Sequence, residues 1–102
     1  MRATKILETC LYVDDLSEAE AFYTQVLGLE CFARVEGRHA FFRLDDAVLL
    51  LFNAESTRVS MDSDIPTHGA TGEGHAAFAM PVQDIDRWRA HLTEHEVQIE
   101  CE

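Results

Sequence analysis

Two side chains able to bind a metal ion occupy equivalent places in two similar stretches of this chain. Glu8 lies in ETCLYVDDLSEAEAFYTQVLG, and His75 begins HAAFAMPVQDIDRWRAHLTEH. In both stretches a short apolar run is followed by an amphipathic helix pattern. A carboxylate and an imidazole together suit Mn²⁺, Fe²⁺, Ni²⁺ or Zn²⁺. The pair is a candidate site for such a divalent metal, which two protein ligands alone would hold weakly.

Each candidate ligand also has a purely structural interpretation. An unpaired acid buried in an apolar strand is costly, so Glu8 otherwise lies in a hydrated cleft or pairs with an arginine. A lone histidine such as His75 is most often structural. His68, within PTHGATGEGH, is a possible third ligand, an acid–base group or a simple loop residue. We interpret His91 and His95, four residues apart on the second helix, as part of a solvated face.

A substrate cleft is predicted beside these candidates. Alternation along LETCLYV places Glu8, Cys10 and Tyr12 on the same strand face, a carboxylate beside a thiol and a phenol. Cys10 and Tyr12 are therefore expected to line the cleft, and Ala77 in the second stretch is assigned to it as well. The phenylalanines of HAFFRL and AVLLLF are interpreted as core residues.

The local signals predict a βαβββ unit, a linker and a shorter βαβ unit. Asp15 is a good helix N-cap and Gly28 a good helix end. The expected strands are residues 7–13, 29–35, 39–44, 47–52, 75–80 and 97–102, and the expected helices follow Asp15 and Asp84. Antiparallel hairpins beside helices that cover one sheet face indicate an α+β fold.

We therefore expect a single domain of three parts. Residues 1–53 form the first module, residues 54–73 a polar linker loop, and residues 74–102 an incomplete second module. The linker is long for a loop inside a small domain, so it is expected to form a lid or to contain a short turn of helix.

Composition narrows the possible partners and location. The chain has 102 residues and a net charge of −11, which argues against nucleic acid as a partner. We see neither a signal peptide nor an apolar run of membrane-spanning length, so no membrane association is expected. Three cysteines without a CxxC spacing indicate reduced thiols in the cytoplasm.

The sequence resembles the glyoxalase/bleomycin resistance/extradiol dioxygenase superfamily, also called vicinal oxygen chelate proteins. The resemblance rests on ILETCLYVDDLSEAEAFYTQVLGLE, HAFFRLDDAVLLLFN and GEGHAAFAMP. It implies paired βαβββ modules around a cleft that holds one divalent metal. Glu8 then falls at the first-strand ligand position, where members more often carry histidine, and His75 matches its counterpart.

The resemblance also points to ligands that this chain lacks. AVLLLF offers no donor where glyoxalase I-like members place Glu or Gln, and the remaining family Glu would lie on a strand beyond Glu102. The implied function is small-molecule binding, with a metal-dependent lyase, isomerase or dioxygenase reaction when the site is complete. The alternatives are a non-catalytic protein like the drug-sequestering branch and an inactive fragment. An unpaired sheet edge at the incomplete module predicts a homodimer.

Overall fold

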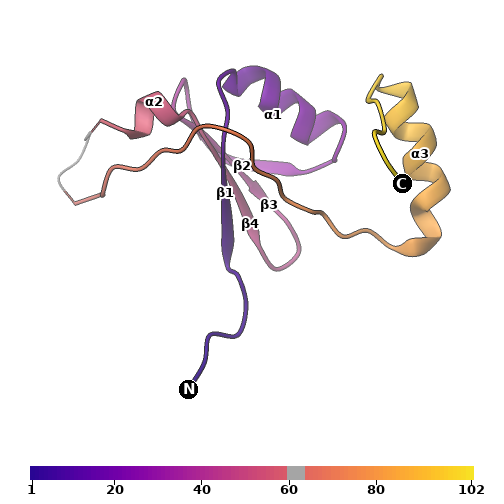
Figure 1. Cartoon of the computed structure of the whole chain (residues 1–102), viewed down its shortest axis with the longest axis horizontal. Helices are drawn as coiled ribbons and strands as arrows, with labels where there is room; N and C mark the ends of the chain where they lie inside the picture. Colours follow the sequence, from indigo (N-terminus) through magenta and orange to yellow (C-terminus); the bar gives the residue numbers. More distant parts are fainter. Residues whose placement is uncertain (60–63) are drawn as a thin grey trace.

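The computed structural model describes residues 1–59 and 64–102, so part of the predicted linker lies outside the described residues. The elements form a mixed α+β arrangement, as the local signals predict (Figure 1). In chain order they are β1 (Glu8–Tyr12), α1 (Leu16–Gln25), β2 (Glu30–Val35), β3 (His39–Arg43), β4 (Val48–Phe52), α2 (Ala54–Thr57), the 3₁₀ turn η1 (Val82–Asp84) and α3 (Ile85–Glu94). The short helix α2 opens the segment that was predicted as a linker.

The four strands form one sheet in the order β1-β4-β3-β2. β1 runs parallel to β4, whereas β4, β3 and β2 are successively antiparallel. The hairpin between β2 and β3 turns at Gly37, whose φ of +73° is a conformation that glycine adopts without strain. The first module thus has the predicted βαβββ order, with its first and last strands side by side.

Helix α1 covers one face of this sheet. Asp15 caps it as predicted, because the Asp15 carboxylate accepts a hydrogen bond of 3.0 Å from the backbone N–H of Glu18. The core of this face consists of buried side chains from the two central strands: Ala40, Phe42, Leu49 and Leu51. Leu16, Ala19 and Tyr23 of α1 pack against them at the spacing of one helix face.

The second half of the chain differs from the prediction. Residues 75–80 and 97–102 were expected to be strands, and within the described residues 64–102 no strand forms. Instead, residues 70–78 run past β1 on their way to α3 (Figure 1). Phe78 packs on the first module's core, with its ring 6.1 Å from that of Tyr23. The strand predictions were wrong here because a strand needs a hydrogen-bonded neighbour, which the apolar pattern alone does not supply.

The helix predicted after Asp84 does form, but it packs loosely. No residue of α3 is fully buried, and Ile85 at its start is 45% exposed. The described residues form no second sheet that would cover its apolar side. Every helix in the described part of the chain is too short or too polar to span a bilayer.

We expect Leu51→Ala to lower the free energy of unfolding by about 2–5 kcal/mol, since it leaves a cavity in the centre of the sheet. Leu51 is fully buried. The measurement is urea denaturation followed by circular dichroism. Val82→Ala is the matched control, because Val82 is 80% exposed, and its change should stay within about 0.5 kcal/mol. Equal effects of the two substitutions would contradict this assignment of the core.

Candidate functional site

A hollow beside the predicted site residues lies where residues 70–76 run past strand β1. It has a volume of about 720 Å³. Its wall combines one end of β1 with the segment leading to α3. The lining residues are Cys10, Leu11, Tyr12, Val13, Asp14, Tyr23, Ala54, residues 70–76 and Phe78.

The structure brings some of the predicted residues together and separates others. Cys10, Tyr12 and His75 all line this hollow, which we call the β1 hollow. Glu8 lies at the exposed start of β1, outside its lining. Ala77 is also exposed and outside the lining, whereas Ala76 is part of it. The segment passes β1 without pairing as a strand, so its placement could not be read from strand alternation.

His68 is held against the sheet by several contacts. Its Nδ1 lies 2.7 Å from the Tyr12 hydroxyl, its backbone N–H donates to the Thr57 carbonyl at 3.0 Å, and its ring meets the Phe52 ring edge-on at 4.6 Å. Burial, with a smaller contribution from the Cys10 thiol, raises the pKa of Tyr12. The phenol is therefore neutral at physiological pH, and its hydroxyl shares a hydrogen bond with Nδ1 of His68.

Cys10 is not an activated nucleophile in this setting. Desolvation and, to a lesser extent, the negative charge of Glu8 raise the pKa of the Cys10 thiol. A reactive cysteine needs the opposite, a nearby positive charge or helix N-terminus that favours the thiolate. Cys10 therefore contributes a protonated thiol to the β1 hollow.

The metal-competent residues that the structure describes do not form a complete metal centre. Among the residues that the structure describes, no group of three His, Cys, Asp or Glu side chains is placed to hold a metal ion. Zinc sites and non-haem iron sites in proteins generally use three or more protein ligands. Glu8 and His75 alone fall short of this, and His68 already uses Nδ1 for Tyr12.

A set of aromatic side chains lies on the sheet face opposite α1. Phe32, His39, Phe41 and Phe52 belong to it, and Tyr12 and His68 extend it toward the β1 hollow. The interpretation of Phe52 as buried holds, but Phe41 is only half-buried. The alternation of HAFF was the available signal, because Ala40 and Phe42 face α1 and their neighbours face the other way.

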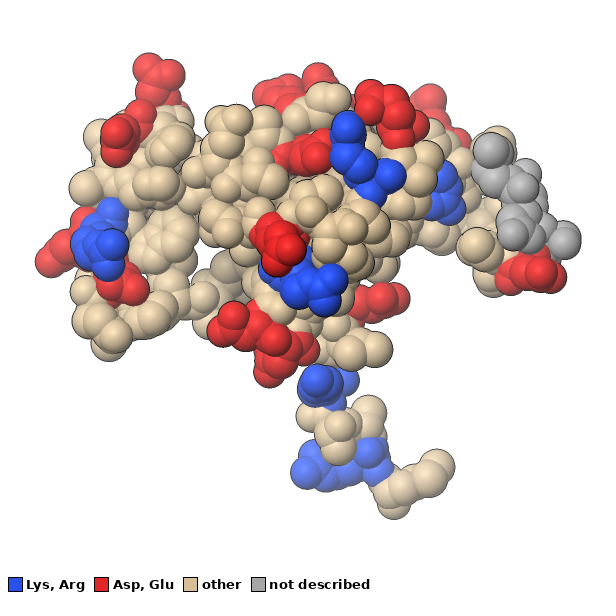
Figure 2. Space-filling view, turned by 180° about the vertical axis from the view of Figure 1, so that it is seen from behind, with Lys and Arg blue, Asp and Glu red and all other residues tan. Residues whose placement is uncertain are grey.

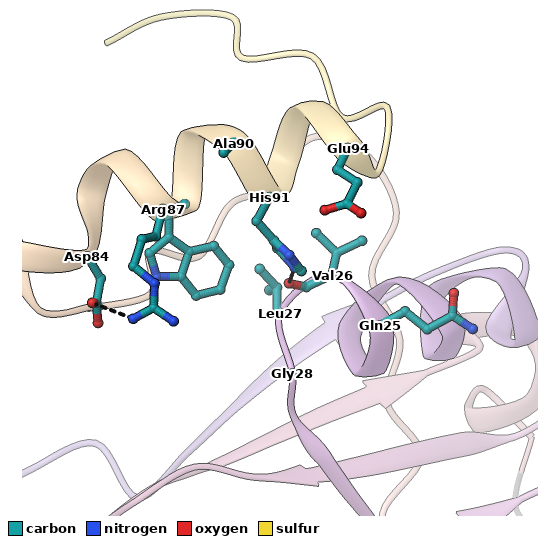
Figure 3. Close-up of a pocket in the computed structure, with 10 residues that line it drawn as sticks. Gln25, Val26, Leu27, Gly28, Asp84, Arg87, Ala90, His91 and Glu94 are labelled. Carbon is teal, nitrogen blue, oxygen red and sulfur yellow. Dashed lines mark hydrogen bonds and ion pairs between the residues drawn. The ribbon is translucent and has the colours of Figure 1, made fainter.

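A second pocket, of about 610 Å³, lies between the end of α1 and α3 (Figure 3). Here the His91 side chain reaches from α3 to the Val26 carbonyl, with Nε2 at 2.8 Å, and Arg87 pairs with Asp84 on its own side of the pocket. His91 is therefore half-buried rather than part of a fully solvated face. We call this pocket the seam pocket and interpret it as the place where α3 packs against the end of α1.

Comparison with known proteins gives one family and many similar structures. The model of the Glyoxalase/Bleomycin resistance protein/Dioxygenase superfamily matches residues 5–102. No curated protein sequence matches the chain significantly. A lactoylglutathione lyase from Agrobacterium tumefaciens is 37% identical, with a TM-score of 0.90 over 99% of this chain and 77% of that one.

Two further structures share the fold at lower identity. A glyoxalase/bleomycin resistance protein/dioxygenase from Nocardioides is 22% identical, with a TM-score of 0.70 over 99% of this chain and 68% of that one. A fosfomycin resistance protein from Listeria monocytogenes is 15% identical, with a TM-score of 0.67 over 100% of this chain and 72% of that one.

Alkylation of Cys10 tests the electrostatics beside the β1 hollow. In a background with Cys31→Ala and Cys101→Ala, the pH midpoint of the reaction with iodoacetamide should lie above that of an unstructured cysteine peptide. Glu8→Gln should move this midpoint to lower pH, because loss of the negative charge favours the thiolate. Glu30→Gln, on the far edge strand β2, should leave the midpoint unchanged. A shift with Glu30→Gln but not with Glu8→Gln would contradict the placement of Glu8.

Proposed function

We propose a small-molecule-binding function for this chain, because the chain belongs to the Glyoxalase/Bleomycin resistance protein/Dioxygenase superfamily and carries a ligand-sized hollow beside β1. The observation that supports it most is the convergence of Cys10, Tyr12 and His75, which come from two distant parts of the sequence, on that hollow. Each of the three side chains can recognise polar atoms of a ligand.

The size and lining of the β1 hollow support this proposal. Its volume of about 720 Å³ lies within the usual range for small-molecule sites, roughly 300–1,000 Å³. Such sites combine apolar walls with a few fixed polar groups. Leu11, Tyr23 and Phe78 supply apolar surface, and the Tyr12 hydroxyl is fixed by His68.

A metal-dependent lyase, isomerase or dioxygenase is the second candidate. Its support is the 37% identity to a protein described as lactoylglutathione lyase. Glu8 and His75, with Nε2 of His68 as a possible addition, are the donors that this chain would contribute to Mn²⁺, Fe²⁺, Ni²⁺ or Zn²⁺. They do not complete a site by themselves, so this candidate requires donors from elsewhere, such as a second copy of the chain.

We also propose a homodimer in a reducing compartment. Strand β1 lies at one edge of the sheet, next to β4. An exposed strand edge favours pairing with another chain. All three cysteines are free thiols, which is consistent with a cytoplasmic location. The excess of acidic side chains disfavours nucleic acid as the partner.

Binding of S-lactoylglutathione tests the main proposal. We expect this compound to shift the backbone amide resonances of Cys10, Tyr12 and His75 in nuclear magnetic resonance spectra of the labelled chain. Trp88→Phe, in the seam pocket, should leave these shifts intact, whereas Tyr12→Leu should weaken them by removing the fixed hydroxyl. Shifts that cluster around α3 instead would place ligand binding in the seam pocket and contradict the proposal.

Calorimetric titration with Mn²⁺, Ni²⁺ and Zn²⁺ tests the second candidate. We expect weak binding by the wild-type chain that is lost in Glu8→Ala and in His75→Ala, because each removes one of two donors. His95→Ala, on exposed α3, is the control and should bind like wild type. Tight binding that survives both donor substitutions would place the metal elsewhere. Tight binding that is lost in both would show that further donors complete the site and would favour the enzyme.

A further inference from the structure

We propose that the seam pocket binds a small organic cation, an ammonium group carried on an apolar body. The pocket shares no lining residue with the β1 hollow, so the inference goes beyond the proposed function and does not depend on it. Its walls come from the end of α1 and from one side of α3 (Figure 3). Its volume of about 610 Å³ is sufficient for a small molecule, since such sites usually measure roughly 300–1,000 Å³.

The end of helix α1 is one source of negative charge in the seam pocket. The last turn of α1 contains no basic side chain, so nothing on the helix itself offsets the partial negative charge at its C-terminus. The last backbone carbonyls of a helix have no partner within the helix and accept hydrogen bonds from outside it. His91 donates to one of them, the Val26 carbonyl, with Nε2 at 2.8 Å. This contact shows that a donor inside the pocket can reach the end of α1.

Glu94 supplies a full negative charge on the α3 side of the pocket. Its side chain and that of His91 both extend from α3 toward the end of α1 (Figure 3). Among the described residues, the ion pairs of α3 are made by Arg87 and Arg89, and none of them involves Glu94. A carboxylate without a basic partner at a pocket wall is well placed to accept charge-assisted hydrogen bonds from an ammonium group.

The positive charge of Arg87, which also lines the pocket, is already paired. Its Nη1 donates to the Asp84 carboxylate at 3.1 Å, and its side chain is 84% exposed. This pair lies at the start of α3, whereas Glu94 is the last residue of that helix. His91, between them along the helix, directs its Nε2 proton at the Val26 carbonyl. The end of the pocket that contains Glu94 therefore keeps an excess of negative charge.

Trp88 supplies the surface on which the apolar body of such a cation can lie. The side chain is half-buried, and its ring is perpendicular to that of His91, with an interplanar angle of 90° and centroids 5.5 Å apart. Leu27 and Ala90 add further apolar surface to the lining. Tryptophan has the most favourable ring for contact with a cation, because the face of its π-system is negative. The pocket thus combines an aromatic wall with a carboxylate and a helix C-terminus.

The charge of the whole chain also favours a cation over an anion. The chain carries 19 acidic and 8 basic residues, and acidic side chains are spread widely over the face shown in Figure 2. Such a surface attracts cations and repels anions before any contact is made. A second copy of the chain carries the same negative excess, and this repulsion disfavours it as the occupant of the seam pocket.

Binding of phenethylammonium and 2-phenylethanol, which share a shape but differ in charge, tests the inference. We expect the cation to bind at least about ten times more tightly than the alcohol in calorimetric titration. It should also shift the indole N–H resonance of Trp88, the single tryptophan of the chain. Glu94→Gln should abolish the preference for the cation, and Trp88→Leu should weaken its binding. Glu96→Gln, which removes an exposed acid outside the pocket lining, is the control and should retain the preference.

Three results of the titrations would overturn the inference. The first is equal affinity for the two compounds, and the second is a preference that survives Glu94→Gln in a variant with the wild-type circular dichroism spectrum. The third is a set of shifts at Cys10, Tyr12 and His75 that leaves Trp88 unchanged. A Trp88 resonance that moves upon dilution, without any ligand, would identify the pocket as an interface between copies and would also overturn it. The proposed function fails separately if S-lactoylglutathione leaves the β1 hollow unchanged.

Discussion

Strand β4 is the element on which the rest of this structure depends. Its residues from Leu49 to Phe52 are buried, and it pairs with β1 on one side and β3 on the other. A strand enclosed on both faces and both edges satisfies its backbone only through these two neighbours. Pairing with β1 is parallel, so the chain must leave β1, cross one face of the sheet as α1 and return through β2 and β3. The positions of Cys10 and Tyr12 follow from this pairing.

The alternation of side chains then divides the sheet into two different surfaces. Ala40, Phe42, Leu49 and Leu51 face α1 and form the core. Their sequence neighbours face the other way, away from α1. The core and the aromatic side chains on the sheet face opposite α1 are therefore made by the same strands. A substitution that shifts the register of β3 would expose the first and bury the second at once.

In the first module, local sequence patterns are enough to predict the helix and the buried strand. Asp15, Gly28 and the apolar run AVLLLF predict the helix start, the helix end and the buried strand, and all three are found. The same kind of pattern predicted strands at 75–80 and 97–102, where none forms. The difference is physical, because helix α1 satisfies its own hydrogen bonds, whereas a strand depends on a partner elsewhere in the chain. Phe78 packs its side chain against the core of the first module instead.

By itself, the sequence determined the elements of the first module, the faces of its strands and the candidate residues Glu8, Cys10, Tyr12 and His75. These depend on spacing and capping within a few residues. Only the tertiary structure decided that His68 meets Tyr12 from 56 positions away and that Glu8 lies outside the β1 hollow. It also decided that Arg38 lies over Phe52. Contacts between distant segments depend on how β1, β3 and β4 pair and where the later chain lies on them, and no local pattern in the sequence encodes that geometry.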